Sequence, residues 1–131
     1  MRFLVACCCL LSLACGGDTK QPVDVPVSRV GTYSLRTVDG LTLPISISGG
    51  FVLTGESLVL NADSTFTTHT DQQYSDASGT HTTTLSSAGT YSVSDLRLTL
   101  YFANATALAL NFTGDDEVTG HCCSRTWVYR R

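Results

Sequence analysis

From residue 29 onward, apolar and polar residues alternate, and a chain with this two-residue period buries its apolar side chains only as strands. Thr, Val, Tyr and Phe recur at every second position, and Gly, Asp and Asn interrupt them at intervals of roughly eight to twelve residues. No window has the apolar period of about 3.6 residues that an amphipathic helix requires. The pattern therefore predicts an all-β chain.

Eight strands are predicted between the turn residues. They are expected near 29–38, 41–48, 51–60, 65–73, 80–93, 96–102, 106–113 and 117–130. A meander of eight strands covers a common apolar face by rolling up, and closure also removes the exposed edges that invite aggregation. The predicted architecture is a small eight-stranded antiparallel up-and-down barrel, with a two-sheet β-sandwich as the alternative.

The lengths of the loops predict which residues lie opposite one another. A three-residue loop at 103–105 brings two strands together with one apolar face, made of Leu96, Leu98, Leu100, Phe102, Leu108, Leu110 and Phe112. A turn at Ser94-Asp95 sets Val93 opposite Leu96, and a loop at 62–64 sets Leu60 opposite Phe66. Asp39-Gly40 is typical of a type I′ turn, whereas Pro44 makes the following segment an edge strand or a bulge.

The first fourteen residues have the composition of a secretory signal peptide. Arg2 gives a positive start, and the apolar run from Phe3 to Ala14 is shorter than the roughly 20 residues of a membrane-spanning helix. Residues 15–28 contain Gly16-Gly17, Pro22 and Pro26, which predicts an extended tether. The chain is thus divided into a leader at 1–14, a tether at 15–28 and a β-domain at 29–131.

The junction of leader and tether resembles the lipobox of bacterial lipoproteins. It reads Leu11-Ser12-Leu13-Ala14-Cys15, followed at once by glycines. The resemblance implies that Cys15 is lipidated, and Gly16 beside it implies an outer-membrane lipoprotein with its domain in the periplasm or at the cell surface. Two or three acyl chains on one cysteine anchor a protein in a membrane, whereas one chain holds it weakly. An ordinary secreted protein with an unacylated Cys15 is the alternative.

Only two cysteines remain for the β-domain, since three of the six lie in the leader and Cys15 is expected to carry lipid. Cys122 and Cys123 are adjacent, so no long-range disulfide framework is available. On a strand their side chains would point to opposite faces. They can close a strained ring, pair between molecules or stay reduced, and a structural or incidental role is favoured.

Several short motifs of residues 29–131 resemble small bacterial lipocalin-like lipoproteins. They are Gly31-Thr32-Tyr33-Ser34-Leu35, Val38-Asp39-Gly40, the segment 58–66, Gly89-Thr90-Tyr91 and Trp127-Val128-Tyr129-Arg130-Arg131. In lipocalins a glycine and an aromatic residue on the first strand pack against an arginine from the end of the barrel. The resemblance implies a barrel-closing group of Gly31, Tyr33 and Arg130, with Arg131 as the alternative cation, in a non-catalytic barrel.

The common apolar face predicts that the barrel interior binds a small apolar ligand or lipid. The residues expected to line it are Tyr33, Tyr91, Leu98, Leu100, Leu108, Leu110 and Trp127. For Trp127, simple filling of the core is favoured over a role in a pocket. A second hypothesis is a protein-binding barrel that inhibits an envelope hydrolase such as a lysozyme or a protease. A third is a purely structural role in the envelope.

The sequence offers no pattern for catalysis, metal binding or nucleic-acid binding. No Gly-x-Ser-x-Gly elbow follows a strand and no glycine loop precedes a lysine, so neither an enzyme nor a cofactor is predicted. His69 and Asp71 share a face near His81, but the inward Phe66 turns both outward, and His121 with Cys123 gives only two ligands. A net charge of −3 with a single lysine argues against a nucleic-acid interface.

Overall fold

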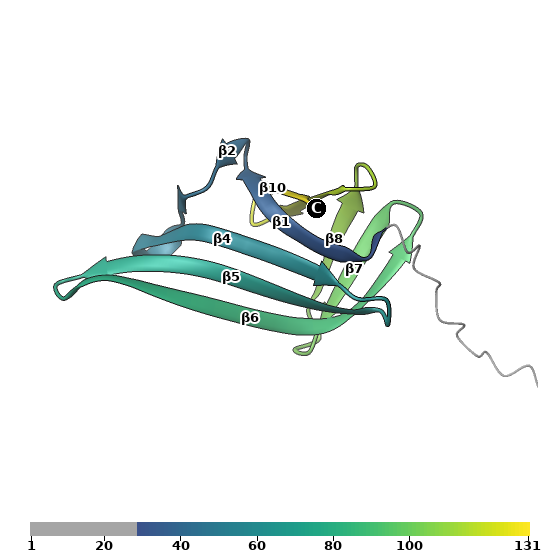
Figure 1. Ribbon diagram of the computed structural model, residues 1–131, viewed down its shortest axis with the longest axis horizontal. Helices are drawn as coiled ribbons and strands as arrows, with labels where there is room; N and C mark the ends of the chain where they lie inside the picture. The colour runs from purple at the N-terminus through teal and green to yellow at the C-terminus, as the bar shows by residue number, and fades with distance from the viewer. Residues whose placement is uncertain (1–28) are drawn as a thin grey trace, which may run out of the picture.

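The computed structural model describes residues 29–131, so the predicted leader, Cys15 and the tether lie outside the described part. This part is nearly all β, which confirms the predicted class (Figure 1). A three-residue 3₁₀ turn lies at Ser48–Gly50. The strands are β1 (Gly31–Val38), β2 (Leu41–Thr42), β3 (Ile45–Ser46), β4 (Phe51–Leu60), β5 (Thr65–Asp76), β6 (Gly79–Ser94), β7 (Arg97–Phe102), β8 (Ala107–Phe112), β9 (Glu117–Cys122) and β10 (Arg125–Arg130).

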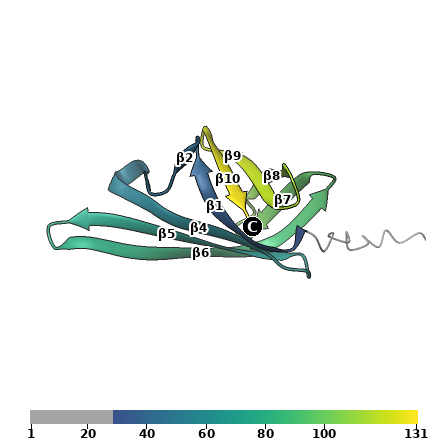
Figure 2. The same ribbon diagram turned by 45° about the horizontal axis from the view of Figure 1, so that its top comes forward.

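Eight of these strands close into an antiparallel barrel. Strand β1 pairs with β10 on one side and with β4 on the other, and the remaining strands follow in chain order from β4 to β10. The short strands β2 and β3 extend the sheet beside β1 and β4. One continuous sheet with up-and-down connections confirms the predicted barrel, and the two-sheet sandwich is not formed (Figure 2).

Two of the eight predicted strands were wrong, although the barrel still has eight. The segment 41–48 does not form a barrel strand, because Pro44 interrupts it and leaves only β2 and β3. The segment 117–130 is a hairpin, β9 and β10, joined at Cys123-Ser124. Both turn residues have positive φ, 55° and 63°, without the glycine or asparagine that normally marks such a turn.

The predicted registers are confirmed at three hairpins and corrected at one. Leu98 lies opposite Leu110, Leu60 lies opposite Phe66, and Asp39-Gly40 forms the turn in which both residues have positive φ. Val93 lies opposite Leu98 rather than Leu96, because the turn uses Asp95-Leu96 instead of Ser94-Asp95. A shift of two residues keeps every side chain on its predicted face. Leu96 is the exception, since it sits in the turn and is 57% exposed.

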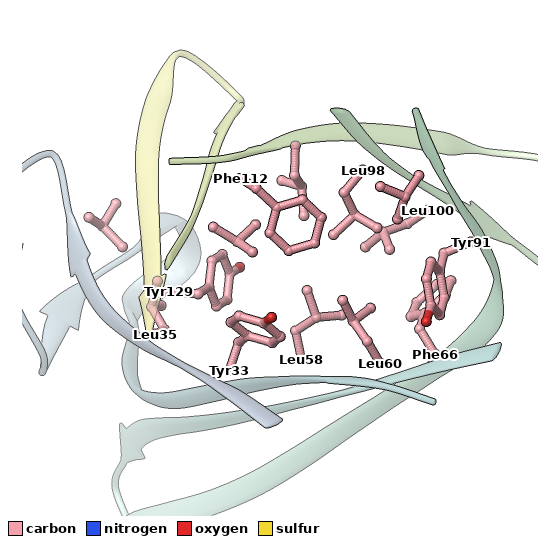
Figure 3. Close-up of a cluster of buried hydrophobic side chains, with 14 of the residues drawn as sticks. Tyr33, Leu35, Leu58, Leu60, Phe66, Tyr91, Leu98, Leu100, Phe112 and Tyr129 are labelled. Atoms are coloured by element: carbon pink, nitrogen blue, oxygen red, sulfur yellow. The ribbon is translucent and has the colours of Figure 1, made fainter. Parts of the chain in front are cut away.

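The core side chains converge inside the barrel (Figure 3). The loops 61–64, 95–96 and 113–116 meet at one end, where Tyr91 donates its amide to Ser64 and Phe112 donates to Leu96. We call this the closed end, and the opposite end, formed by the loops 39–50, 103–106 and 123–124, the mouth. Ten side chains are less than 2% exposed: Tyr33, Phe66, Phe112, Leu53, Leu58, Leu60, Leu98, Leu100, Val38 and Val118.

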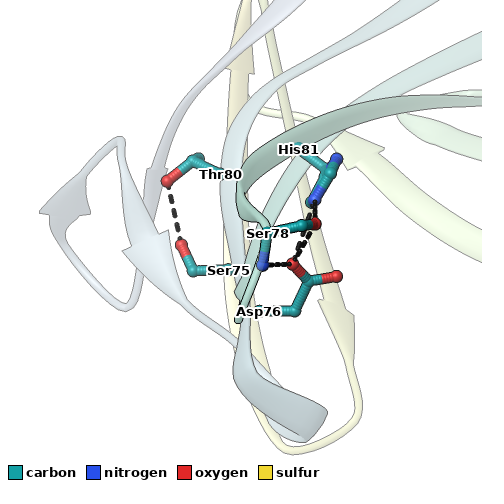
Figure 4. A network of polar contacts seen from close by, with 5 residues as sticks. All are labelled: Ser75, Asp76, Ser78, Thr80 and His81. Carbon is teal, nitrogen blue, oxygen red and sulfur yellow. Dashed lines mark hydrogen bonds and ion pairs between the residues drawn. The ribbon is translucent and has the colours of Figure 1, made fainter.

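Strands β5 and β6 form a hairpin that projects beyond the barrel on the mouth side (Figure 1). We call its residues 71–84 the arm. Along its inward face, the Tyr74 ring lies 5.5 Å from Phe51 and stacks on His81 at 5.0 Å. At the tip, Asp76 accepts hydrogen bonds from the Ser78 amide and hydroxyl at 2.8 and 2.6 Å, and His81 lies 3.2 Å away (Figure 4). These bonds lower the pKa of Asp76 and hold the tip in one conformation.

Candidate functional site

The mouth of the barrel contains a small cavity of about 180 Å³. It is lined by side chains of β4, β8, β9 and β10, namely Glu56, Leu108, Leu110, Gly120, Cys122, Trp127 and Tyr129. We call this the mouth cavity. A hollow of about 340 Å³ shares the lining residue Trp127 with it, and a further hollow of about 490 Å³ shares Arg125 with that second hollow. Three hollows thus lie along the mouth.

Glu56 enters the mouth cavity because of the two-residue period of β4. Leu60 and Leu58 point into the barrel, and Glu56 is the next residue on the same face. Its Oε1 accepts a hydrogen bond of 2.7 Å from the Tyr129 hydroxyl. Burial raises the pKa of Glu56, while hydrogen bonds from Tyr129 and Thr70 oppose that rise. The pKa of Tyr129 is raised in turn, by burial first and then by the negative charge of Glu56.

The Glu56 carboxyl group has no cationic partner among residues 29–131. The described ion pairs involve other carboxylates, and the arginine nearest the mouth hollows, Arg125, lies 3.9 Å from Asp39. A charged group removed from water without a counter-ion is unfavourable, since desolvation is not offset by attraction. The mouth cavity therefore holds an unneutralised acidic group between apolar walls.

Trp127 contributes an unsatisfied polar group to the same cavity. Its Nε1 atom is buried and has no hydrogen-bond partner among the described residues. Buried polar atoms are nearly always hydrogen-bonded in native proteins, so an exception calls for an explanation such as a ligand or water. Trp127 lines both the mouth cavity and the 340 Å³ hollow.

The seven predicted ligand-lining residues divide between the wall of the mouth cavity and the packed core. Leu108, Leu110 and Trp127 line the mouth cavity. The other four are buried in the core and do not line it: Tyr33, Tyr91, Leu98 and Leu100. The Tyr33 hydroxyl donates to the Arg29 carbonyl at 2.8 Å and the Tyr91 hydroxyl to Asn61 at 2.6 Å, so both tyrosines are satisfied within the protein. Sequence reasoning missed Glu56, although its place in the alternation after Leu58 was a usable signal.

The predicted barrel-closing group requires one correction. The Arg131 guanidinium lies 5.9 Å from the centre of the Tyr33 ring, and its Cδ approaches within 3.0 Å of where a Cβ on Gly31 would stand. Arg130 instead pairs with Glu117 at 2.6 Å on the outer surface. Successive strand residues face opposite ways, so only one of the two arginines can reach the ring. The closing cation is Arg131 rather than Arg130.

The candidate metal ligands lie apart on the barrel surface. His69 contacts the Ser86 hydroxyl at 2.9 Å, Asp71 accepts from Thr84 at 2.6 Å, and His121 contacts Thr126 at 3.0 Å. Within residues 29–131 no three His, Cys, Asp or Glu side chains form a group that could hold a metal ion. In the same stretch, none of the helical structure has the length and hydropathy needed to cross a bilayer.

Comparisons with known proteins give one distant structural match. No protein-family model matches the chain, and no curated protein matches it. Among solved structures, the crystal structure of the Cpx pathway activator NlpE from Escherichia coli matches at 20% identity and a TM-score of 0.43, over 69% of this chain. The chain spans 42% of the length of that protein. A match at this level carries no argument about this chain, and the lipocalin-like resemblance of its motifs stays a prediction.

Proposed function

We propose that the protein is an envelope lipoprotein, anchored through Cys15, whose non-catalytic barrel binds a small amphipathic ligand at its mouth. The observation that carries the proposal is the Glu56 carboxyl group, held in the mouth cavity beside Trp127 with no cation to neutralise it. Drug-sized ligands usually occupy about 300 Å³ or more. The cavity of about 180 Å³ therefore fits a small head group, and the adjoining hollows extend the space for an apolar tail.

The chemistry of the cavity favours a cationic head group. An ammonium ion beside Glu56 would offset the cost of keeping the carboxylate out of water. The Trp127 ring adds a face on which a cation can stack, worth about 0.5 to 2 kcal/mol depending on burial. Leu108 and Leu110 offer apolar contact to the carbon chain next to the head group. We therefore infer a small amphipathic amine rather than a fatty acid or a wholly apolar ligand.

The path of the chain is consistent with a ligand taken from the side facing away from the membrane. Arg29, the first described residue, lies at the closed end, where its guanidinium contacts the Asp95 carbonyl and stacks 4.5 Å from the Phe112 ring. The predicted tether of residues 15–28 joins the domain at this end. An anchor on Cys15 would thus be attached at the end of the barrel opposite the mouth.

Binding of matched amphiphiles to the full chain tests the proposal. Alkylammonium ions, alcohols and carboxylates of the same chain length are titrated while the fluorescence of Trp127, the one tryptophan, is followed. We expect the ammonium ion to bind at least about tenfold more tightly than the alcohol, a difference of about 1.4 kcal/mol. The carboxylate should bind weakest of the three.

Three variants make the test specific. Glu56→Gln should remove the preference for the ammonium ion, whereas Glu117→Gln, which alters a carboxyl group at the closed end, should leave it intact. Gly120→Ala should weaken all three ligands, because its Cβ would stand 2.1 Å from Leu110 Cδ2 and displace the cavity wall. An ammonium preference that survives Glu56→Gln, or equal binding of all three amphiphiles, would refute the proposal.

The arm supports a second candidate function, inhibition of an envelope hydrolase. A protein-binding barrel of this kind needs a protruding element, and the arm projects from the barrel with its tip held by the bonds of Asp76 (Figure 4). A preordered loop loses little entropy on docking. The test is the rate of a purified lysozyme and a purified protease with and without the full chain. Inhibition that is lost in Asp76→Ala and kept in Glu56→Gln would favour this function over ligand binding.

A further inference from the structure

The turn between β9 and β10 places two thiol groups in contact. The Sγ atoms of Cys122 and Cys123 are 3.1 Å apart, and neither cysteine is in a disulfide. Cys123 is exposed and Cys122 is half-buried. Cys122 lines the mouth cavity, and Cys123 lines the adjoining hollow of about 340 Å³. A reagent in the mouth therefore has access to both sulfur atoms.

The backbone of the turn is what brings the two sulfur atoms together. Neighbouring residues on a strand point to opposite faces, so adjacent cysteines within β9 would hold their thiols apart. Cys123 instead has a φ of 55° and is followed by Ser124 with a φ of 63°. Among residues 29–131 this is the one place where two successive non-glycine residues have positive φ. Such residues are strained by about 1 to 2 kcal/mol each, and strain of this kind is concentrated at functional sites.

We propose that Cys122 and Cys123 form a thiol–disulfide exchange site that takes low-molecular-weight disulfides as substrate. The Cys123 thiolate attacks one sulfur of the disulfide R–S–S–R, forming a mixed disulfide and releasing RS⁻. The Cys122 thiolate then attacks the Cys123 sulfur, forming the Cys122–Cys123 disulfide and releasing the second RS⁻. The two cysteines lose two electrons, the substrate is reduced to two thiols, and the two cysteine protons pass to the released thiolates. This site does not depend on the proposed ligand.

Exposure and hydrogen bonding set the order of the two attacks. Cys123 is the more accessible thiol. The hydrogen bond with Cys123 and burial raise the pKa of Cys122, which reduces the fraction of Cys122 present as the attacking thiolate. Once Cys123 carries the mixed disulfide, that hydrogen bond is lost and Cys122 is already in contact with the target sulfur. The second attack is intramolecular and is favoured by this proximity.

The product is a reversible link rather than a structural one. The Cα atoms of disulfide-bonded cysteines usually lie about 4.4 to 6.8 Å apart, but those of adjacent residues are fixed at about 3.8 Å. The ring is therefore strained, and strained disulfides are readily reduced. Because Cys122 lines the mouth cavity with Trp127, ring closure should also change the surroundings of the indole.

Peptide mapping of the full chain in glutathione redox buffers tests the proposal. Trypsin releases residues 98–125, a peptide that contains Cys122 and Cys123 and none of the other four cysteines. After oxidation and alkylation, we expect this peptide to be two hydrogen atoms lighter than the reduced form and to carry no alkyl group. Trp127 fluorescence should change over the same range of redox potential. The peptide should return to the reduced form in dithiothreitol.

Single substitutions test the order of attack. Cys122→Ser should accumulate a stable glutathione adduct on Cys123, and Cys123→Ser should react with glutathione disulfide at least about tenfold more slowly than the wild-type chain. Wild-type peptide that stays reduced, that ends as a glutathione adduct, or that is linked to a second chain would overturn the proposal. These three results are read on the wild-type protein, so they do not depend on how well the variants fold.

Discussion

The closed end and the mouth are built from the same barrel strands, yet they differ in how completely their groups are satisfied. At the closed end Tyr33, Leu60 and Phe112 are at most 1% exposed, and the tyrosine hydroxyl has a backbone partner. At the mouth the same sheet surrounds a cavity of about 180 Å³, a carboxyl group without a cation and an indole N–H without an acceptor. The packed core at the closed end thus contributes stability, and the unsatisfied polar groups at the mouth lower it.

Two leucines on neighbouring strands give the sharpest test of this contrast. Leu98 is fully buried, whereas Leu108 lines the mouth cavity and is only partly covered. Leu98→Ala should lower the free energy of unfolding by about 2 to 5 kcal/mol, because it leaves a void in a packed core. Leu108→Ala should cost about 1 kcal/mol or less, because the cavity already exists. Urea denaturation of the full chain measures both, and equal losses would contradict the contrast between packed core and cavity wall.

A second test compares one carboxyl group from each end as a function of pH. The pKa of Glu56 is raised, so the folded protein holds this proton more tightly than the unfolded chain does. The stabilisation is therefore complete below the ordinary glutamate pKa of 4.5. It is lost as the pH rises through the folded pKa of Glu56, and it does not return at higher pH. Over that pH range, Glu56→Gln should be more stable than wild type, by less than the loss of stability expected for Leu98→Ala.

Glu117 at the closed end should give the opposite sign. Hydrogen bonds from Thr113 and then Arg130 lower its pKa, so its contribution is present above the ordinary glutamate pKa and is lost as pH falls through the folded value. Glu117→Gln should therefore lose stability relative to wild type at neutral pH and match it in acid. Denaturant titrations of both variants across the acidic range measure the two slopes, and slopes of the same sign would be inconsistent with this assignment.

Relief of strain at the mouth should have an effect of about 1 kcal/mol. Ser124 has a φ of 63°, a conformation that glycine adopts without the steric cost of a Cβ. Ser124→Gly should raise the free energy of unfolding by that amount while leaving both thiols in place. Its control is Ser92→Gly within β6, where the backbone is extended and glycine should destabilise. A loss of stability in Ser124→Gly would show that the turn is not strained.

The smallest effect is expected from the two C-terminal arginines. Arg131 lies over the Tyr33 ring and pairs with Asp116 at 2.5 Å, whereas Arg130 is paired on the outer surface. Surface ion pairs usually contribute little. Arg131→Ala should lower the thermal midpoint slightly and Arg130→Ala even less. The reverse order would argue that Arg130, as first predicted, is the closing cation.

Much of the barrel could be predicted because side chains alternate with a period of two, so a register error of two residues leaves each side chain on its correct face. Val93 was assigned the wrong partner, yet the shift was two residues and its face stayed correct. The hairpin at Cys123-Ser124 was missed because neither cysteine nor serine is typical of a turn in which both residues have positive φ. The segment 41–48 was taken as one strand although Pro44 lay within it. Local signals thus located the turns that contain glycine, asparagine or aspartate, with the register at Asp95 wrong by two residues, and they failed at Cys123-Ser124.

The candidate site was harder to predict than the fold. Leu108, Leu110 and Trp127 were expected to line a pocket and do line the mouth cavity, while Tyr33 and Leu98 are in the packed core. All five belong to the same alternating pattern, and Leu98 lies directly opposite Leu110, so the pattern does not separate cavity wall from packed core. Which side chains border the cavity depends on the stagger of all eight strands, which no single hairpin reveals. Glu56 was overlooked because a charged residue in a strand is usually assigned to the outside.

The amino-acid pattern alone determined that this protein is an antiparallel all-β chain, the inward side of most strands, and most of the hairpin partners. These properties depend on residues that are near one another in sequence. Only the tertiary structure decided where the interior is filled, where it is hollow, which arginine covers Tyr33 and that two adjacent thiols meet. Those properties depend on strands far apart in sequence, and on the backbone angles of a turn whose residues do not reveal it.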